Sequence, residues 1–207
     1  MEKVLIAYTT NSGSTAEVAQ VIGEELAKKG AVVEVCRLEE VTSLDAYAAV
    51  VIGAPMILGW HRAAVRFVRR HQIALSQRPV ALFFMAMSLT QTGETRVDHV
   101  PVIVDAELAK PPKIEGRLSF RERYATLANY LRPVLKAAPM IKPVSVGFFG
   151  GKLEYFRLKV FALLFVMLVI QVQPADKRNW SLIRGWAGNL YPLFFGAQPG
   201  DASKRVI

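Results

Sequence analysis

The sequence is poor in the residues that build metal centres and covalent cross-links. Its 207 residues include one cysteine, Cys36, and three histidines, His61, His71 and His99. A single cysteine excludes a disulfide framework and a thiolate metal cluster, and the histidines do not have the spacing of a metal-ligand set. We therefore expect no metal site, and the lone thiol fits a reducing cytosol.

Two nucleotide-binding signatures and two membrane-related signals are also missing. The chain contains neither G-x-x-x-x-G-K-[ST] nor G-x-G-x-x-G, which excludes a nucleotide P-loop and argues against a dinucleotide fingerprint. The apolar run Phe161–Ile170 is too short to span a bilayer. Because the N-terminus leads directly into a predicted strand, we expect no signal peptide.

Acidic residues are scarce relative to basic ones. The chain has 17 Asp and Glu against 26 Lys and Arg, a formal net charge of +9. Such an excess predicts an acidic partner, which could be anionic lipid, a carboxylate-rich substrate or nucleic acid. We expect no nucleic-acid partner, because no binding motif accompanies the charge. A basic surface that simply faces solvent remains the alternative.

Predicted strands and helices alternate along the chain. The strands are Val4–Tyr8, Ala31–Arg37, Tyr47–Ile52, Val80–Met87 and Val144–Phe149, and the helices are Ala16–Lys29, His61–His71, Leu118–Ala138, Tyr155–Gln171 and Asn179–Leu190. This alternation is typical of a parallel sheet with right-handed crossovers. We predict a single α/β domain over residues 1–207, with 89–116 as an insertion after the fourth strand and 152–195 as a basic, apolar C-terminal helical region.

The loop between the first strand and the first helix has the composition of an anion site. It consists of Thr10, Asn11, Ser12, Gly13, Ser14 and Thr15. The first N–H groups of a helix lack internal partners and favour negative charge, hydroxyls add donors, and a glycine allows close approach of the backbone. Because the loop has no lysine, it suits a monophosphate. An N-cap cluster on an ordinary α/β turn is the alternative interpretation.

This loop resembles the FMN-phosphate loop of flavodoxins, [ST]-x-[ST]-G-x-[ST]. The resemblance implies FMN as the cofactor and a flavodoxin-like, doubly wound, five-stranded parallel sheet of order 2-1-3-4-5. Ligands of such sheets lie beyond the carboxyl ends of the strands, at the switch point of the strand order. The loops after the first, third and fourth strands should therefore meet at one site.

Two loops and a glycine pair complete the predicted flavin site. We expect the loop after the third strand to cover one face of the ring, the loop after the fourth strand to reach its other side, and the glycines after the fifth strand to adjoin it. These cofactor-binding residues are Ala54, Pro55, Met56, Ile57, Leu58, Gly59, Met87, Ser88, Leu89, Thr90, Gly150 and Gly151. Trp60 could stack on the ring or serve as a helix staple. No catalytic side chain is named, because the flavin itself carries the redox chemistry. His61 and His71 could relay protons, but capping or solvation is the commoner role.

Two further segments resemble menaquinone-dependent protoporphyrinogen dehydrogenases. Residues 53–71 look like the G-A-[SP]-…-G-x-x-H and F-V-[KR]-[KR]-H patterns of that family, and residues 176–186 are similar to D-x-R-D-W-x-x-I-x-x-W. The resemblance is absent over Leu89–Gly116, a segment that we expect to shape the substrate entrance. It implies a quinone-linked FMN dehydrogenase with protoporphyrinogen IX or a related reduced substrate as donor. A flavodoxin-type electron carrier between redox proteins is the alternative, and a domain that binds no flavin is the third possibility.

The placement of the basic residues indicates an anionic membrane surface as a partner. The basic residues in question are Arg62, Arg66, Arg69 and Arg70 on one short helix, and Lys152, Arg157, Lys159, Lys177, Arg178 and Arg184 around the apolar run Phe161–Ile170. Basic residues near anionic lipid and an apolar helix at the interface would together attach the protein without a spanning helix. The alternative is that this run is a core helix. We expect a cytoplasmic protein, peripheral on the inner face of the membrane, and make no prediction of its oligomeric state.

Overall fold

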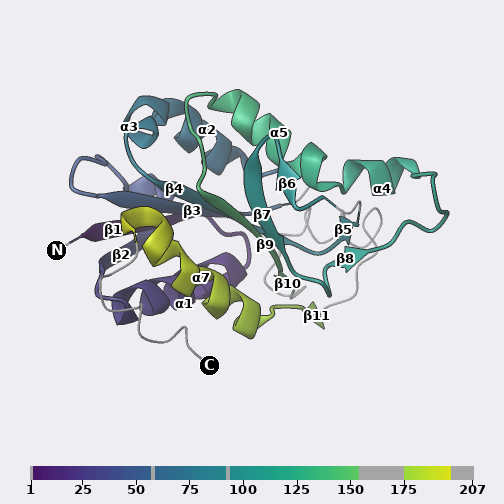
Figure 1. Ribbon diagram of the computed structural model, residues 1–207, viewed down its shortest axis with the longest axis horizontal. Helices are drawn as coiled ribbons and strands as arrows, with labels where there is room; N and C mark the ends of the chain where they lie inside the picture. Colours follow the sequence, from purple (N-terminus) through teal and green to yellow (C-terminus); the bar gives the residue numbers. More distant parts are fainter. Residues whose placement is uncertain (1, 57–58, 92–93, 154–174, 197–207) are drawn as a thin grey trace.

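The computed structural model describes residues 2–56, 59–91, 94–153 and 175–196 (Figure 1). The predicted helix Tyr155–Gln171, the apolar run Phe161–Ile170 and the predicted flavin neighbours Ile57 and Leu58 lie outside the described residues. Most of the predicted sheet, the phosphate loop and the last helix lie within them.

The centre of the molecule is a twisted, mostly parallel sheet. It is formed by β1 (Lys3–Tyr8), β2 (Val32–Arg37), β3 (Ala49–Pro55), β4 (Val80–Ala86), β6 (Arg96–Val97), β7 (Val100–Val104) and β9 (Ser145–Gly150). The strand order is β2-β1-β3-β4-β9-β7-β6. The first five strands confirm the predicted order 2-1-3-4-5, and all pairs among them are parallel. The expected number of strands was too low, because two strands of the insertion extend the sheet beyond β9.

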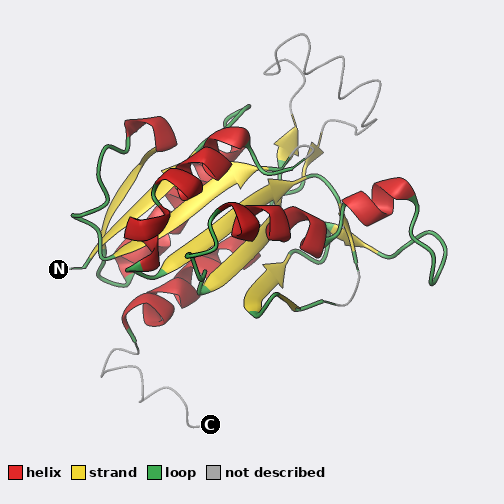
Figure 2. Ribbon diagram, turned by 90° about the horizontal axis from the view of Figure 1, so that it is seen from above, coloured by secondary structure: helices red, strands yellow, loops and turns green. Residues whose placement is uncertain are grey.

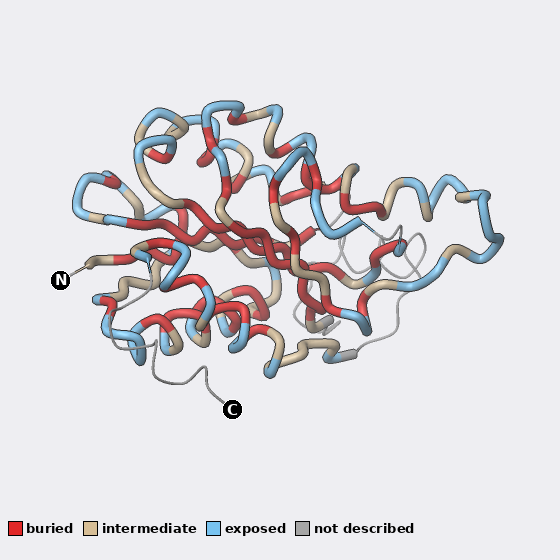
Figure 3. The backbone as a smooth tube through the Cα atoms, in the orientation of Figure 1, coloured by how far each residue is buried: buried red, intermediate tan, exposed pale blue. Residues whose placement is uncertain are grey.

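The middle strands are apolar along their whole length because helices cover both of their faces. All residues of β4 and six of the seven residues of β3 are buried. A strand that alternated apolar and polar residues would place polar groups against one of these helical layers, whereas a continuous apolar run does not. Figure 3 shows the sheet as the buried layer of the molecule, with the exposed segments outside it.

Helices pack on both faces of the sheet (Figures 1 and 2). Helices α1 (Ser14–Lys28) and α7 (Trp180–Phe195) share one hydrophobic core with the sheet, and α2 (Arg62–Arg70), α3 (Gln72–Ser76) and α5 (Leu127–Ala137) share the other. The connection from β2 to β3 contains only a short 3-10 turn, η1 (Leu38–Glu40). Among the described residues, none of the helices is long and apolar enough to cross a membrane.

One predicted helix is divided into two, and another is followed by a helix that was not predicted. The predicted helix Leu118–Ala138 becomes α4 (Phe120–Tyr124) and α5, because Ser119 and Thr126 each cap a new helix start with their side-chain oxygens. The predicted helix His61–His71 is confirmed as α2, and α3 follows it from Gln72, beyond the predicted range. The expected end of α1 is confirmed: Gly30 lies at φ +97°, and its N–H donates to the Ala27 carbonyl.

The insertion after β4 is part of the fold and not only a surface loop. It contains β5 (Leu89–Thr90), which pairs with β8 (Ala109–Lys110), and the hairpin of β6 and β7. The predicted β-like run Val102–Val104 lies in β7 and pairs in parallel with β9. A second small sheet joins β10 (Lys152–Leu153) to β11 (Ala175–Asp176). Deletion of residues 91–115 would therefore remove the strand that covers β9, and the role of the insertion at a substrate entrance stays a prediction.

Candidate functional site

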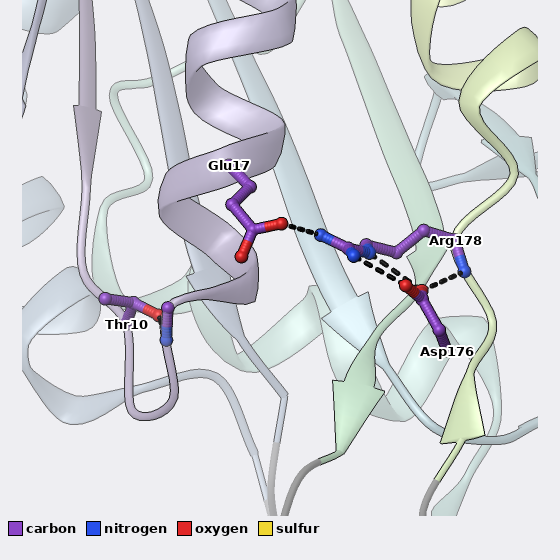
Figure 4. A network of polar contacts seen from close by, with 5 residues as sticks. Thr10, Glu17, Asp176 and Arg178 are labelled. Atoms are coloured by element: carbon purple, nitrogen blue, oxygen red, sulfur yellow. Dashed lines mark hydrogen bonds and ion pairs between the residues drawn. The ribbon is translucent and has the colours of Figure 1, made fainter. Parts of the chain in front are cut away.

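The loop after β1 is tied to its neighbours by the backbone and by one threonine. The N–H of Thr9 donates to the Gly53 carbonyl at 3.0 Å, so the loop begins beside the end of β3. The Thr10 hydroxyl accepts from the N–H of Gly13 at 2.9 Å, which closes the loop (Figure 4). Gly13 is the N-cap of α1 and lies at φ +95°, a conformation that favours glycine. The loop therefore presents backbone and hydroxyl groups at the start of a long helix.

The start of α1 has donors that suit a phosphate. Within the described residues, no side chain caps this helix. The Thr15 hydroxyl in its first turn is fully buried and has no hydrogen-bond partner among the described residues. A buried hydroxyl without a partner costs free energy, and a phosphate oxygen at the helix N-terminus would supply one. The residues present thus fit the phosphate of FMN better than an ordinary capped turn.

The loop after β3 lies against the end of β4. Met56 donates its N–H to the Met85 carbonyl at 2.8 Å, and the chain turns at Gly59, where φ is +112°. Of the residues predicted to flank the ring here, Ala54 and Met56 are buried in the core, whereas Pro55 and Gly59 are half-buried. Backbone atoms of this loop are therefore more available to a ligand than the side chains of Ala54 and Met56.

Trp60 belongs to the core. Its ring is 6% exposed and stacks on Phe84 with 4.9 Å between ring centroids. Its indole N–H is buried without a partner among the described residues. This packing favours the core interpretation of Trp60 over a ring that stacks on the flavin.

The loop after β4 meets the two glycines that follow β9. Gly150 is paired with Ala86 at the end of β4, and the N–H of Gly151 donates to the Ala86 carbonyl at 2.8 Å. Met87 and Ser88 come next in the chain, and Leu89 and Thr90 form the buried strand β5. The structure thus brings the loops after β1, β3 and β4 and the glycine pair to the carboxyl edge of the sheet, as predicted. Their individual contacts with a flavin stay predictions.

An arginine that the sequence placed in a family-like segment and on a basic surface is buried at this edge. The Arg178 side chain is 5% exposed. It contacts the Asp176 carboxylate through Nε at 2.8 Å and Nη2 at 2.5 Å, and the Glu17 carboxylate through Nη1 at 2.5 Å (Figure 4). Its guanidinium also lies over the Trp180 ring, and its hydrogen bonds hold the pKa of Asp176 below its usual range.

The position of Glu17 explains what Arg178 contributes. Glu17 lies in the first turn of α1, next to the predicted phosphate loop. Its carboxylate suits the helix dipole but would repel a bound phosphate. Arg178 pairs with that carboxylate and so joins the segment that leads into α7 to the start of α1, while Asp176 holds the guanidinium from within its own segment. The D-x-R spacing was visible in the sequence, but the partner on another helix was not.

Arg178→Lys is expected to weaken FMN binding and to lower the free energy of unfolding by about 1–2 kcal/mol. A lysine has a single donor nitrogen and cannot reproduce the contacts that three guanidinium nitrogens make with the two carboxylates, and the exposed fractions of these carboxylates, 42% and 46%, reduce the loss that a buried pair would show. FMN titration and urea unfolding measure the two effects. Arg184→Lys is the matched control, since Arg184 also joins α7 to α1 through Glu25 but is 43% exposed. Equal behaviour of the two variants would contradict the assigned role.

Lys177 brings a second cation to the same edge. Its ammonium donates to the Met87 carbonyl at 3.3 Å, and its backbone N–H donates to the Gly151 carbonyl at 3.1 Å. The positive charge is therefore fixed beside the loop after β4. No pattern in the sequence distinguishes this lysine from the other basic residues.

His61 caps α2. Its Nδ1 accepts from the N–H of Ala63 at 3.2 Å, which is the bond expected of an N-cap residue. Burial lowers the pKa of His61, and burial also lowers the pKa of His71. The neutral imidazole is the form that can accept the capping bond, so this geometry favours a cap over a proton relay.

We expect the protein to lose stability as the pH falls below about 6.5, the usual pKa of histidine in an unfolded chain. Because the folded pKa of His61 is lowered, the unfolded state takes up the proton first, and stability is fully present only above that pH. Urea midpoints at several pH values between neutrality and mild acid measure the slope. His61→Asn keeps a capping group without titrating and should flatten the slope, whereas the exposed His99→Asn should not.

The sheet order and the phosphate loop at its switch point define a doubly wound α/β protein with a site for a phosphorylated cofactor. A family model described as "Flavodoxin domain" matches residues 5–179, and the chain belongs to this family. This membership confirms the predicted fold and FMN as the cofactor, and it makes the chain a flavoprotein of the oxidoreductase class.

Curated and solved proteins of known name are also similar to parts of the chain. A protoporphyrinogen IX dehydrogenase [quinone] of Escherichia coli strain K12 is 36% identical over 85 residues, and so is that of strain O157:H7. The match covers 39% of this chain and 46% of those proteins, so it spans about half the length of the curated relatives. An archaeal flavodoxin aligns with a TM-score of 0.48 at 14% identity, over 91% of this chain and 96% of that one. Megasphaera elsdenii flavodoxin aligns with a TM-score of 0.46 at 12% identity, over 90% and 98%.

Proposed function

We propose that this chain is an FMN-dependent dehydrogenase that oxidises protoporphyrinogen IX, or a related reduced substrate, and passes the electrons to a quinone. The observation that carries the proposal is the 36% identity over 85 residues to protoporphyrinogen IX dehydrogenase [quinone], in a chain with an FMN site. The resemblance of residues 53–71 and 176–186 to the sequence patterns of that enzyme family supports the same activity.

The residues of the site have distinct tasks in this proposal. Bound FMN supplies a ring that accepts hydride equivalents and releases electrons. The loop from Thr10 to Thr15 holds the phosphate, and Arg178 removes the repulsion from Glu17. The loops after β3 and β4 flank the ring and exclude water from it. Lys177 keeps a positive charge beside the loop after β4, which favours added negative charge on a nearby group.

We further propose that the protein works at the cytoplasmic face of an anionic membrane, where a quinone is within reach. The excess of 26 basic over 17 acidic residues supports this location. So does α2, whose four arginines form no ion pair with a described residue. Three of them, Arg66, Arg69 and Arg70, line an open hollow of about 510 Å³ between η1 and α2, whose lining also includes Leu38 and Phe67.

An absorbance spectrum of the purified protein and a turnover assay test the proposal. The protein should show the flavin bands, and reduced porphyrinogen should be oxidised in the presence of a menaquinone analogue. A flavin that exchanges electrons with redox proteins but never oxidises porphyrinogen would instead identify an electron carrier. A protein that takes up no FMN would contradict both.

A further inference from the structure

One segment of the insertion projects from the body of the molecule. Residues 110–123, here called the projecting arm, run from β8 through a turn and into α4 (Figures 1 and 2). Both views show the arm extending past the rest of the described chain, and Figure 3 shows that it is largely exposed. It leaves the sheet at its carboxyl edge, because β8 pairs with β5, which follows directly after β4.

The arm has a defined shape despite its exposure. The Glu122 carboxylate accepts from the N–H of Lys113 at 2.7 Å, and from the N–H and hydroxyl of Ser119 at 2.8 and 2.6 Å. These bonds, from Ser119 first, lower the pKa of Glu122 to about 2, so the carboxylate stays charged at neutral pH. Within the loop that they close, Arg117 donates its N–H to the Ile114 carbonyl and Gly116 turns the chain at φ +74°.

The surface of the arm is both apolar and basic. Phe120 is 85% exposed and Ile114 is 61% exposed, and among the described large apolar residues outside the arm only Ile73, at 65%, is as exposed as Ile114. The basic residues of the arm are Lys110, Lys113, Arg117, Arg121 and Arg123, and none of them forms an ion pair with a described residue. Its acids are Glu115 and Glu122, and the second is already used to close the loop.

A lipid surface fits this arm better than a protein partner does. A stable protein interface buries roughly 800 Å² on each side around a central apolar patch, which two separate side chains on a narrow projection cannot supply. Binding to a membrane interface needs a smaller buried area, because each apolar residue that enters the interface and each basic residue near anionic lipid adds to binding. The arm has both kinds of residue and is convex, so that it can reach a flat surface.

We propose that the projecting arm docks the protein on an anionic membrane, with Ile114 and Phe120 inserted among the lipid head groups and the surrounding lysines and arginines on lipid phosphates. The arm adjoins the predicted flavin site at its base, since the hydroxyl of Tyr124, which ends α4, lies 3.9 Å from where a Cβ on Gly59 would stand. Docking through the arm would turn the carboxyl edge of the sheet toward the lipid. Its purpose rests on the proposed quinone-linked function, whereas the docking itself uses no substrate.

Co-sedimentation of the full FMN-loaded chain with lipid vesicles tests the proposal. We expect it to bind vesicles of phosphatidylcholine with roughly one third phosphatidylglycerol, to bind vesicles of phosphatidylcholine alone far less, and to lose binding as salt rises. The double variant Ile114→Ser, Phe120→Ser should bind about tenfold more weakly or worse. The double variant Lys113→Gln, Arg117→Gln should lose most of the preference for anionic lipid.

The chain offers a matched control for exposure and for charge. Ile73 is 65% exposed but lies in α3, which leads into the start of β4 at the opposite edge of the sheet. Ile73→Ser should therefore keep vesicle binding, and Arg62→Gln with Arg69→Gln on α2 should reduce it less than the arm variants do.

Phe120→Trp adds a direct readout, because insertion should shift the emission of that indole to shorter wavelength only with anionic vesicles.

Two results would overturn the proposal. One is equal vesicle binding by the native chain and the Ile114→Ser, Phe120→Ser variant. The other is loss of binding in the α2 variants alone, which would assign the contact to α2. Failure of porphyrinogen oxidation with intact vesicle binding would contradict the proposed function and leave the docking surface standing.

Discussion

Thr15→Val is expected to weaken FMN binding and, at the same time, to stabilise the protein without FMN. The Thr15 hydroxyl is buried and has no partner among the described residues, so its removal relieves a desolvated group in the apoprotein by up to about 1 kcal/mol. In the complex the same change removes a donor to a charged phosphate, which costs roughly 1–3 kcal/mol, or about five- to 150-fold in affinity. Fluorescence titration with FMN and urea unfolding of the apoprotein measure the two opposite effects.

Thr10→Val is the control, because its hydroxyl already has a partner. Its loss leaves the N–H of Gly13 without an acceptor, so the apoprotein should become less stable by about 0.5–1.5 kcal/mol. The double variant Thr10→Ala, Thr15→Ala should bind FMN more weakly than either single variant. Unchanged FMN affinity in that double variant would mean that the phosphate lies elsewhere.

Gly150→Ala is expected to destabilise the protein by about 3 kcal/mol, near the upper end of the range that is typical of overpacking substitutions. A Cβ at this position would lie 1.9 Å from the Lys177 carbonyl oxygen, and backbone of a neighbouring segment cannot turn away as a side chain can. The strand end or the segment before α7 must shift, and FMN binding should fall as well, because that segment holds Arg178 beside Glu17.

The adjacent glycine separates this effect from a general intolerance of the region. At Gly151 a Cβ would lie 3.3 Å from the Met87 sulfur, in a side chain that adapts easily, and 3.6 Å from the Ala86 carbonyl oxygen, an ordinary van der Waals contact. Gly151→Ala should therefore change the urea midpoint little. A similar loss of stability in the two variants would show that the contact with the Lys177 backbone is not what requires a glycine at position 150.

The parts of the fold that could be predicted are those with a local signal. Continuous apolar runs marked β3 and β4, and Gly30 marked the end of α1. The division of the helix Leu118–Ala138 was missed because the periodic apolar residues continue across Thr126 while its side chain caps a new start. Val102–Val104 was visible as a short strand, but nothing local indicates that it pairs with β9 and enlarges the sheet.

In the candidate site, too, features with a local signal could be predicted and contacts between distant residues could not. Its loops could be placed together because the carboxyl ends of parallel strands share one edge. The roles of Arg178, Lys177 and Gly150 could not be predicted, since each depends on a partner distant in sequence: Glu17, Met87 and the Lys177 carbonyl respectively. The sequence left two roles for Trp60, stacking on the flavin or packing as a helix staple. Its contact with Phe84 places it in the core.

The ion pair between Glu17 and Arg178 has a consequence for biosynthesis. The two residues are 161 positions apart, so the ribosome must add that many residues after Glu17 before its partner exists. At about 5–20 residues per second, the phosphate loop spends several seconds or longer beside an unneutralised carboxylate. We therefore expect FMN capture by the nascent chain to stay weak until Arg178 has emerged, so that cofactor loading comes late in folding.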